Sequence, residues 1–106
     1  MENKILVTCK DGIAKAELTG RLDATSAPTL QNALKEILGE KIEHLVLLVK
    51  DLEYISSAGL RVIIFTKQKI GVDAKLYLIQ PQDTVLEIIK MSGLDNFMII
   101  QDSFEE

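Results

Sequence analysis

Residues 44–60 read HLVLLVKDLEYISSAGL and carry the clearest signal of how this chain folds. Residues 45–49 are an unbroken apolar run, which is typical of a central strand covered on both faces, as in a parallel sheet. Ser56 and Ser57 follow. Because serine is a common N-cap, the apolar stretch after them is expected to be a helix through about Lys69. Residues 50–55 are expected to form the loop between this strand and this helix.

The N-terminal part of the chain predicts a hairpin. Residues 5–9 and 13–19 alternate between apolar and polar side chains, which is the period of a half-buried strand. Between them lies Asp11-Gly12, a pair that favours a two-residue turn because both positions tolerate positive φ. The buried face of the second strand is expected to consist of Ala14, Ala16 and Leu18.

A first helix is expected after residues 25–26, because the apolar residues from Leu30 to Leu38 recur at helical spacing. Thr25 or Ser26 can cap it, Pro28 suits its first turn, and Gly39 is expected to end it.

The last third of the chain predicts two more strands and one more helix. The expected elements are a strand at residues 75–80, a helix capped by Asp83 or Thr84 and ended by Gly93, and a strand at residues 97–100. Residues 102–106 are expected to be frayed. The resulting order, ββαβαβαβ, predicts an α/β fold: a mixed sheet with helices packed mainly on one face.

Composition limits the kinds of protein this chain can be. It has 106 residues and a formal net charge of −4, which favours a single domain over residues 1–106 and argues against nucleic acid or an anionic membrane as partner. No apolar run approaches the ~18 residues of a membrane-spanning helix, and the N-terminus has no signal-peptide pattern. Cys9 is the only cysteine, so no internal disulfide forms and a cytoplasmic location is expected.

Few residues of the chain suit catalysis, so we expect it not to be an enzyme. His44, the only histidine, opens the strand whose far end leads to Ser56 and Ser57. Six strand residues span about 20 Å, so His44 cannot activate either serine and is expected to be a surface residue. One Cys and one His do not make a usual zinc site, and glycine-rich phosphate motifs are absent. We therefore expect no metal and no cofactor.

A phospho-acceptor aspartate is one alternative. Asp51 follows the central strand, where receiver domains of response regulators place the residue that they phosphorylate. Those domains also need an acidic pair after the first strand and a lysine after the last. This chain has Asp11 alone at the first place and Gln101-Asp102 at the second. The receiver interpretation is therefore disfavoured.

The two serines before the second helix have two interpretations. As an N-cap, a serine stabilises its helix by about 1 kcal/mol. The free N–H groups and the dipole of a helix N-terminus also favour an anion, so a phosphate would fit there and add about −1.5 to −2 charges. Such a modification would change the surface without breaking the fold, as a docking switch requires.

Residues 51–62, DLEYISSAGLRV, resemble the signature segment of the STAS-domain anti-sigma factor antagonists. Residues 20–23, GRLD, resemble an earlier G-x-L-D element of that family, and residues 91–97, MSGLDNF, resemble its closing helix-to-strand turn. The resemblance covers essentially the whole chain and keeps the order of the elements. It implies a STAS-type fold.

The resemblance also implies a protein-binding switch. In this family the dephosphorylated antagonist binds an anti-sigma factor that is also an ATP-dependent serine kinase, and the sigma factor is freed. The kinase then phosphorylates one serine of the antagonist, the complex dissociates, and a separate serine phosphatase resets it. The motif S-x-G-L places the acceptor at Ser57. Ser56 is a rival hydroxyl, at a position that is often Asp in the family.

The expected topology brings the loop 23–26, the loop 52–55 and the first helical turn 56–60 to one sheet edge. The residues assigned to this partner-binding patch are Asp23, Ala24, Thr25, Tyr54, Ile55, Ser56, Ser57, Ala58, Gly59, Leu60 and Arg61.

Two of these assignments stay open at this point. Asp23 matches a family position beside the acceptor, but it is equally well explained as a turn residue, and Arg61 is either a partner contact or a solvated charge. Farther along the helix, Ile63, Ile64 and Phe65 cannot all face inward.

We expect the chain to be a monomer when alone. The alternative function is that of a STAS subunit in a lipid-transport ATPase or a signalling assembly without sigma-factor regulation, because a fold alone does not separate these roles.

Overall fold

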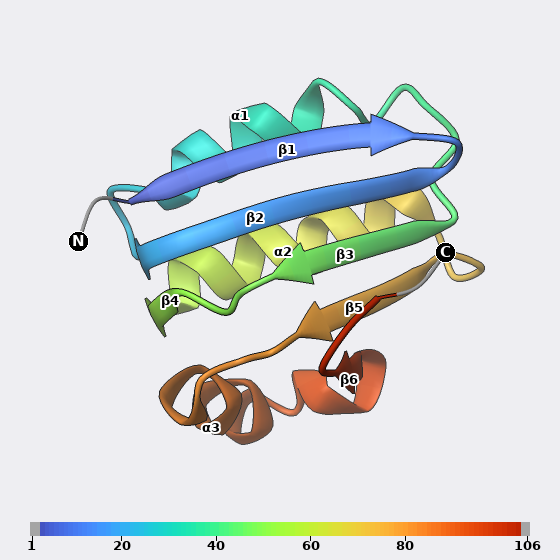
Figure 1. Cartoon of the computed structure of the whole chain (residues 1–106). Coiled ribbons are helices and arrows are strands. Elements are labelled where there is room, and N and C mark those ends of the chain that lie inside the picture. The colour runs from blue at the N-terminus through green and yellow to red at the C-terminus, as the bar shows by residue number, and fades with distance from the viewer. Residues whose placement is uncertain (1–2, 105–106) are drawn as a thin grey trace.

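The computed structural model describes residues 3–104, which form a six-stranded mixed sheet and three α-helices. In chain order the elements are β1 (Lys4–Lys10), β2 (Ile13–Leu22), α1 (Ala27–Lys35), β3 (His44–Leu48), β4 (Leu52–Ile55), α2 (Ser57–Ile70), β5 (Lys75–Ile79), α3 (Asp83–Ser92), the 3-10 helix η1 (Leu94–Phe97) and β6 (Ile99–Gln101) (Figure 1). None of these helices is long and apolar enough to cross a bilayer.

The predicted hairpin is confirmed. β1 and β2 pair antiparallel from Lys4 opposite Thr19 to Lys10 opposite Ile13. Asp11 and Gly12 form the turn with φ of 53° and 81°. Both residues tolerate this left-handed conformation, which is why the pair predicts a turn.

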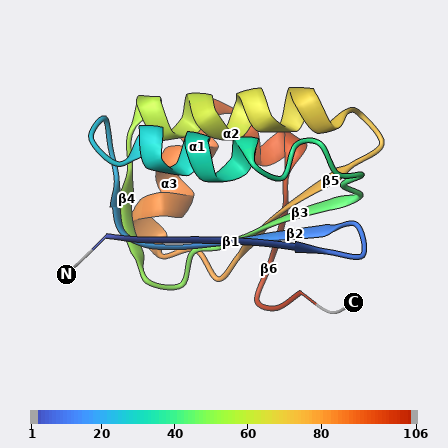
Figure 2. The same ribbon diagram turned by 90° about the horizontal axis from the view of Figure 1, so that it is seen from above.

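The expected mixed sheet with its helices on one face is also confirmed. The main strand order is β1-β2-β3-β5-β6, and every neighbouring pair except β1–β2 is parallel. All three α-helices lie on the same side of the sheet (Figure 2). β3 occupies the centre, and its Leu45, Val46 and Leu47 are fully buried, as the apolar run at 45–49 predicted.

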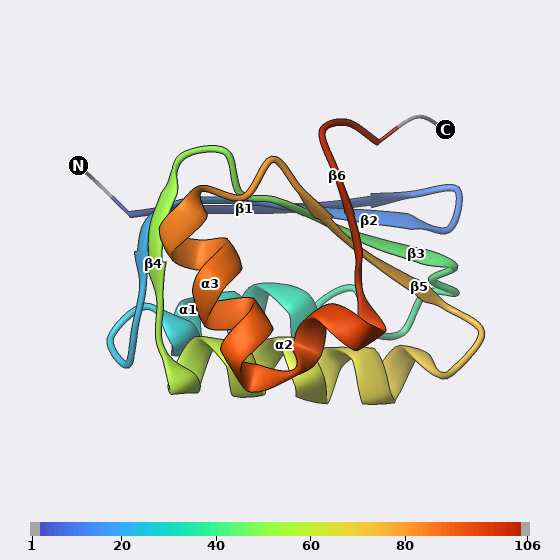
Figure 3. The same ribbon diagram turned by 90° about the horizontal axis from the view of Figure 1, so that it is seen from below.

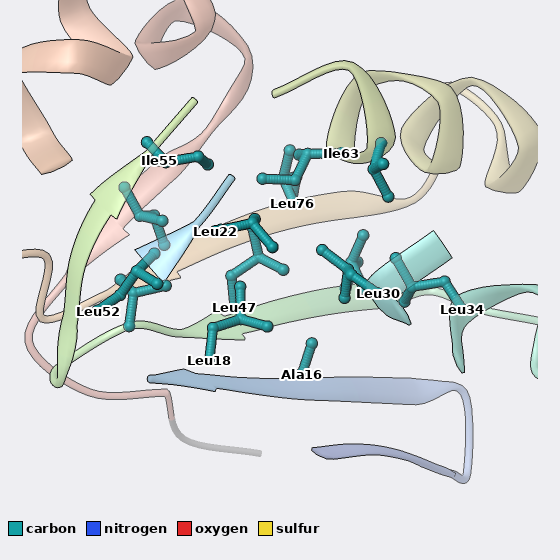
Figure 4. Packing of buried hydrophobic residues seen from close by; sticks show 14 of the residues in the cluster. Ala16, Leu18, Leu22, Leu30, Leu34, Leu47, Leu52, Ile55, Ile63 and Leu76 are labelled. Atoms are coloured by element: carbon teal, nitrogen blue, oxygen red, sulfur yellow. The ribbon is translucent and has the colours of Figure 1, made fainter. Parts of the chain in front are cut away.

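The core lies between the sheet and the helices. The buried face of β2 carries Ala14, Ala16 and Leu18, as expected. The two alanines are small, and Leu30 and Leu34 of α1 pack over this part of the sheet (Figure 4). Small residues on one layer opposite large ones on the next let the layers interdigitate at native density.

The expectation that residues 50–55 form a loop is wrong. Leu52–Ile55 is a short strand, β4, which pairs parallel with the end of β2. β2 has ten residues and β3 only five, so β3 leaves Gly20 to Leu22 without a partner on that side. β4 supplies it, and its end residues Leu52 and Ile55 are 1% and 2% exposed. The observed order therefore has one strand more than ββαβαβαβ.

Element ends differ by a few residues from those expected. The regular part of α1 ends at Lys35, before Gly39, and the residue that precedes α3 is Gln82 rather than Asp83 or Thr84. Gly93 ends α3 with φ of 81°, as predicted. The last strand starts at Ile99, because residues 94–97 form η1.

The described part of the C-terminal segment contacts the sheet through Phe104. The Phe104 ring lies 4.8 Å from the Tyr77 ring and 5.8 Å from the His44 ring, measured between centroids. Residues 105–106 lie outside the described part of the chain. The same cluster corrects the expectation for His44, which is half-buried instead of lying on the surface.

Gly59 allows α2 to lie close to the sheet. A Cβ added at Gly59 would stand 2.8 Å from Cγ and Cδ2 of Leu22, a side chain that is 1% exposed. The first turn of α2 is therefore held directly against the end of β2.

We predict that Gly59→Ala lowers the free energy of unfolding by about 1 kcal/mol. Alanine by itself would favour the helix by about 1 kcal/mol, and overpacking a tight core typically costs about 1–3 kcal/mol. Urea denaturation measures the difference. Gly39→Ala is the matched control, because a Cβ there meets nothing within 4 Å. A Gly59→Ala protein more stable than wild type would contradict the close approach, because the helix preference of alanine would then meet no overpacking cost.

Candidate functional site

The expected patch forms where β2 and β4 end side by side. Leu22 pairs with Ile55, and the backbone N–H of Ser56 donates to the carbonyl oxygen of Leu22 at 2.8 Å. Because α2 starts directly after this bond, its first turn lies beside the turn that leads into α1 (Figure 3). We call residues 23–25 and 54–61 together the α2 edge.

The structure separates the two serines that the sequence left as rivals. Ser56 is the N-cap of α2, and its half-buried hydroxyl oxygen accepts a hydrogen bond from the N–H of Gly59 at 3.3 Å. Ser57 is the first residue of the helix, and its side chain is exposed. One hydroxyl is thus engaged in the cap, and the other faces solvent.

The surroundings of Ser57 suit an anion. It lies at the N-terminus of a 14-residue helix whose first turn has no acidic residue. The unpaired N–H groups and the dipole there favour negative charge. Arg61, four residues along the helix, is exposed on the same face.

Asp23 builds the turn at the other side of the α2 edge. Its Oδ1 accepts hydrogen bonds from the Thr25 hydroxyl at 2.6 Å, the Thr25 N–H at 3.0 Å and the Ser26 N–H at 3.2 Å. The bond from the Thr25 hydroxyl is the main cause that holds the pKa of Asp23 below its ordinary value, followed by the bonds from the Ser26 and Thr25 backbones. The geometry is that of a turn aspartate, one of the two roles considered for it.

Ser26 stands at the N-cap position of α1, as predicted, but its hydroxyl makes no cap bond to the helix. Instead it donates to the carbonyl oxygen of Arg21 at 2.8 Å and accepts from the N–H of Asp23 at 2.9 Å. It therefore ties the turn back to β2.

The residues assigned to the patch differ in exposure. Ala24, Thr25, Ser57 and Arg61 are exposed, whereas Tyr54, Ser56, Ala58 and Leu60 are half-buried. Ile55 and Gly59 are buried, so they support the α2 edge from beneath.

Arg21 is a neighbour of this edge that sequence reasoning missed. Its guanidinium carbon lies 4.4 Å from the centre of the Tyr54 ring, within cation–π range. The contact depends on the parallel pairing of β2 with β4, which places Arg21 opposite Tyr54 and which the sequence did not predict.

Phe65 was left open together with Ile63 and Ile64. Ile63 is 1% exposed, whereas Ile64 and Phe65 are 37% and 40% exposed. Phe65 lines a shallow groove between α1 and α2, which also includes Ala24, Ala58 and Arg61 and so continues the α2 edge.

The receiver-domain interpretation loses its geometric basis. Asp51 is exposed in the turn between β3 and β4. β1 returns directly into the antiparallel β2, and across residues 3–104 no group of three or more His, Cys, Asp or Glu side chains is placed to hold a metal ion. The acidic pair that such a domain needs is thus not assembled.

A mixed sheet with helices on one face defines a small α/β domain, and the α2 edge lies at the N-terminus of one of its helices. Comparison with known families gives a more specific result. The family model of the STAS domain matches residues 4–106, so the chain belongs to the STAS domain family.

Relatives of the chain include two bacterial proteins. RsfB of Mycobacterium tuberculosis, an anti-sigma-F factor antagonist, is 28% identical over 95 residues, or 88% of this chain and 78% of RsfB. BtrV of Bordetella bronchiseptica, a candidate anti-sigma factor antagonist, is 32% identical over 96 residues, or 90% of this chain and 83% of BtrV.

Solved structures show the same fold. An anti-sigma factor antagonist from Mycobacterium paratuberculosis matches with a TM-score of 0.84 at 22% identity, over 97% of this chain and 88% of that one. SpoIIAA in its unphosphorylated form matches with 0.81 at 17% identity, over 96% and 90%. Its phosphorylated form matches with 0.73 at 15% identity, over 96% and 93%.

The division between the two serines predicts unequal effects on stability. Ser56→Ala removes the cap bond to Gly59 and should lower the free energy of unfolding by about 1 kcal/mol. Ser57→Ala removes an exposed hydroxyl and should change it by less than about 0.5 kcal/mol. Chemical denaturation of both variants decides the matter. Equal losses would show that Ser57 shares the capping role.

Proposed function

We propose that this protein is an anti-sigma factor antagonist that works as a phosphorylation switch. Dephosphorylated, it binds through the α2 edge to an anti-sigma factor that is also a serine kinase, and a sigma factor is released. Support comes from its family, from relatives named anti-sigma factor antagonists, and from SpoIIAA, a protein of the same fold that exists in a phosphorylated form. In this role the chain is a binder and a kinase substrate, and it needs no catalytic group of its own.

The observation that carries the proposal is the position of Ser57. Its side chain is exposed at the first residue of α2, while Ser56 accepts the cap bond. Phosphorylation would transfer the γ-phosphoryl group of ATP to Oγ of Ser57, with loss of the hydroxyl proton and release of ADP. A phosphatase would hydrolyse the ester with water and release inorganic phosphate.

A phosphate at Ser57 would change binding more than it changes the fold. It adds about −1.5 to −2 charges, which the helix N-terminus and Arg61 accommodate while the antagonist is free. A partner surface that fits a neutral hydroxyl would have to desolvate that charge without a counter-ion. Such an unpaired buried charge costs about 3–5 kcal/mol, and every 1.4 kcal/mol is tenfold in affinity.

We predict that the cognate kinase and ATP phosphorylate the wild-type protein and Ser56→Ala but not Ser57→Ala. Intact-protein mass spectrometry measures the incorporated phosphate. Ser56→Ala is the matched control, because it removes a neighbouring hydroxyl from the same helix turn. Phosphate on Ser57→Ala would assign the acceptor to another residue.

We predict that Ser57→Asp weakens binding to the anti-sigma factor at least about tenfold, whereas Ser57→Asn stays within about threefold of wild type. The two side chains have nearly the same shape and differ in charge, so the comparison isolates the electrostatic effect. Isothermal titration calorimetry gives both dissociation constants. If both variants bind equally weakly, the loss comes from side-chain size and the charge mechanism fails.

A further inference from the structure

A second hollow lies away from the α2 edge, beside the C-terminal half of α2. It has a volume of about 690 Å³ and is formed by α2, the start of β5 and the η1–β6 segment. Figure 3 shows where these elements lie in the fold. We call it the α2–η1 groove. Its volume falls within the range of about 300–1,000 Å³ that is usual for small-molecule sites.

The α2–η1 groove is mainly apolar. Nine of its thirteen lining residues are apolar, and the buried Ile63 and Leu76 are among them. At its rim Phe97 is 70% exposed and Val72 is 93% exposed. Exposed apolar side chains gathered around a hollow mark a binding surface, because covering them with another apolar group is favourable.

The charged residues of the lining are both lysines, Lys67 and Lys75. The ammonium group of Lys67 donates to the carbonyl oxygen of Gly71 at 2.8 Å, which uses one of its three N–H bonds and holds it at the end of α2. Asp73 and Asp95 are the acidic residues on the adjoining turn and on η1, and neither belongs to the lining. The groove thus combines apolar walls with positive charge, on a chain whose net charge is −4.

We propose that the α2–η1 groove binds a long-chain carboxylate, with the acyl chain along the apolar walls and the carboxylate at the ammonium group of Lys67. A straight acyl chain fits because each buried methylene contributes about fourfold in affinity. A single negative head group matches the one positive charge of Lys67. The Lys75 side chain shares the strand face of Tyr77 and His44, which is turned away from α2. The groove starts at Ile63, more than one helical turn beyond Ser57, so this site is separate from the proposed switch and does not depend on it.

The test is a titration of the full chain, followed by ¹H–¹⁵N NMR, with dodecanoate, dodecan-1-ol and dodecyltrimethylammonium below their micelle concentrations. We expect dodecanoate to shift the resonances of Leu76, Leu94 and Phe97. We also expect it to bind at least about fivefold more tightly than the neutral and cationic chains. Ser57→Asp should bind it as wild type does.

Three variants locate the site. Lys67→Met should abolish the preference for the carboxylate while the alcohol still binds, and Lys35→Met is the charge-matched control outside the groove. Phe97→Ser, at an exposed position, should weaken all three chains about tenfold.

The proposal is overturned if the three amphiphiles bind with equal affinity or if the shifts fall outside the groove. It is equally overturned if Lys67→Met keeps the preference for dodecanoate. Dimerisation that buries the groove would also contradict it, because a second copy of the chain would then be the occupant. Analytical ultracentrifugation at NMR concentration measures that outcome.

Discussion

The parallel pairing of β4 with the last residues of β2 is the constraint on which the rest of this structure depends. The N–H of Gly20 donates to the Asp51 carbonyl at 3.0 Å, and the N–H of Ser56 donates to the Leu22 carbonyl at 2.8 Å. Between these two bonds β4 lies alongside the last residues of β2, beyond the point where β3 ends. The second bond fixes where α2 begins, and the contact of Gly59 with Leu22 fixes how closely it approaches the sheet. A four-residue strand thereby brings the first turn of α2 and the Asp23 turn to the same edge.

In this arrangement the residues that stabilise the α2 edge differ from those exposed on its surface. Ile55, Gly59 and the hydroxyl of Ser56 are used internally, for packing or for the cap, whereas Ser57 and Arg61 remain at the surface. A charge added at the surface therefore meets no buried neighbour that would have to move. One phosphate would shift the net charge of −4 by nearly half, and all of that change would stand at a single helix N-terminus.

The sequence predicts local structure well where one short pattern decides it. Asp11-Gly12 identified the hairpin turn, the apolar run at 45–49 identified the central strand, and Gly93 identified the end of α3. β4 escaped because Leu52-Glu53-Tyr54-Ile55 is too short to show alternation and pairs with residues about thirty positions earlier. The roles of Ser56 and Ser57 escaped for a different reason: both suit a cap, and a shift of one residue in the helix start exchanges them. The packing of Phe104 on Tyr77 and His44 joins residues far apart in the sequence, which no local pattern reports.

The packing of α2 argues for a switch that acts on the partner rather than through a change of fold. Val62 and Ile63 are 8% and 1% exposed, and the buried hydroxyl of Thr66 donates to the Val62 carbonyl at 2.8 Å, so it is satisfied within the helix. To tilt or withdraw this helix would expose those side chains and open the contact between Gly59 and Leu22. A phosphate at the exposed first residue gains nothing from such a movement, because helix N–H groups and Arg61 already favour it in place. The same charge against a docked neutral surface has no such compensation, so the energetic penalty falls on the complex.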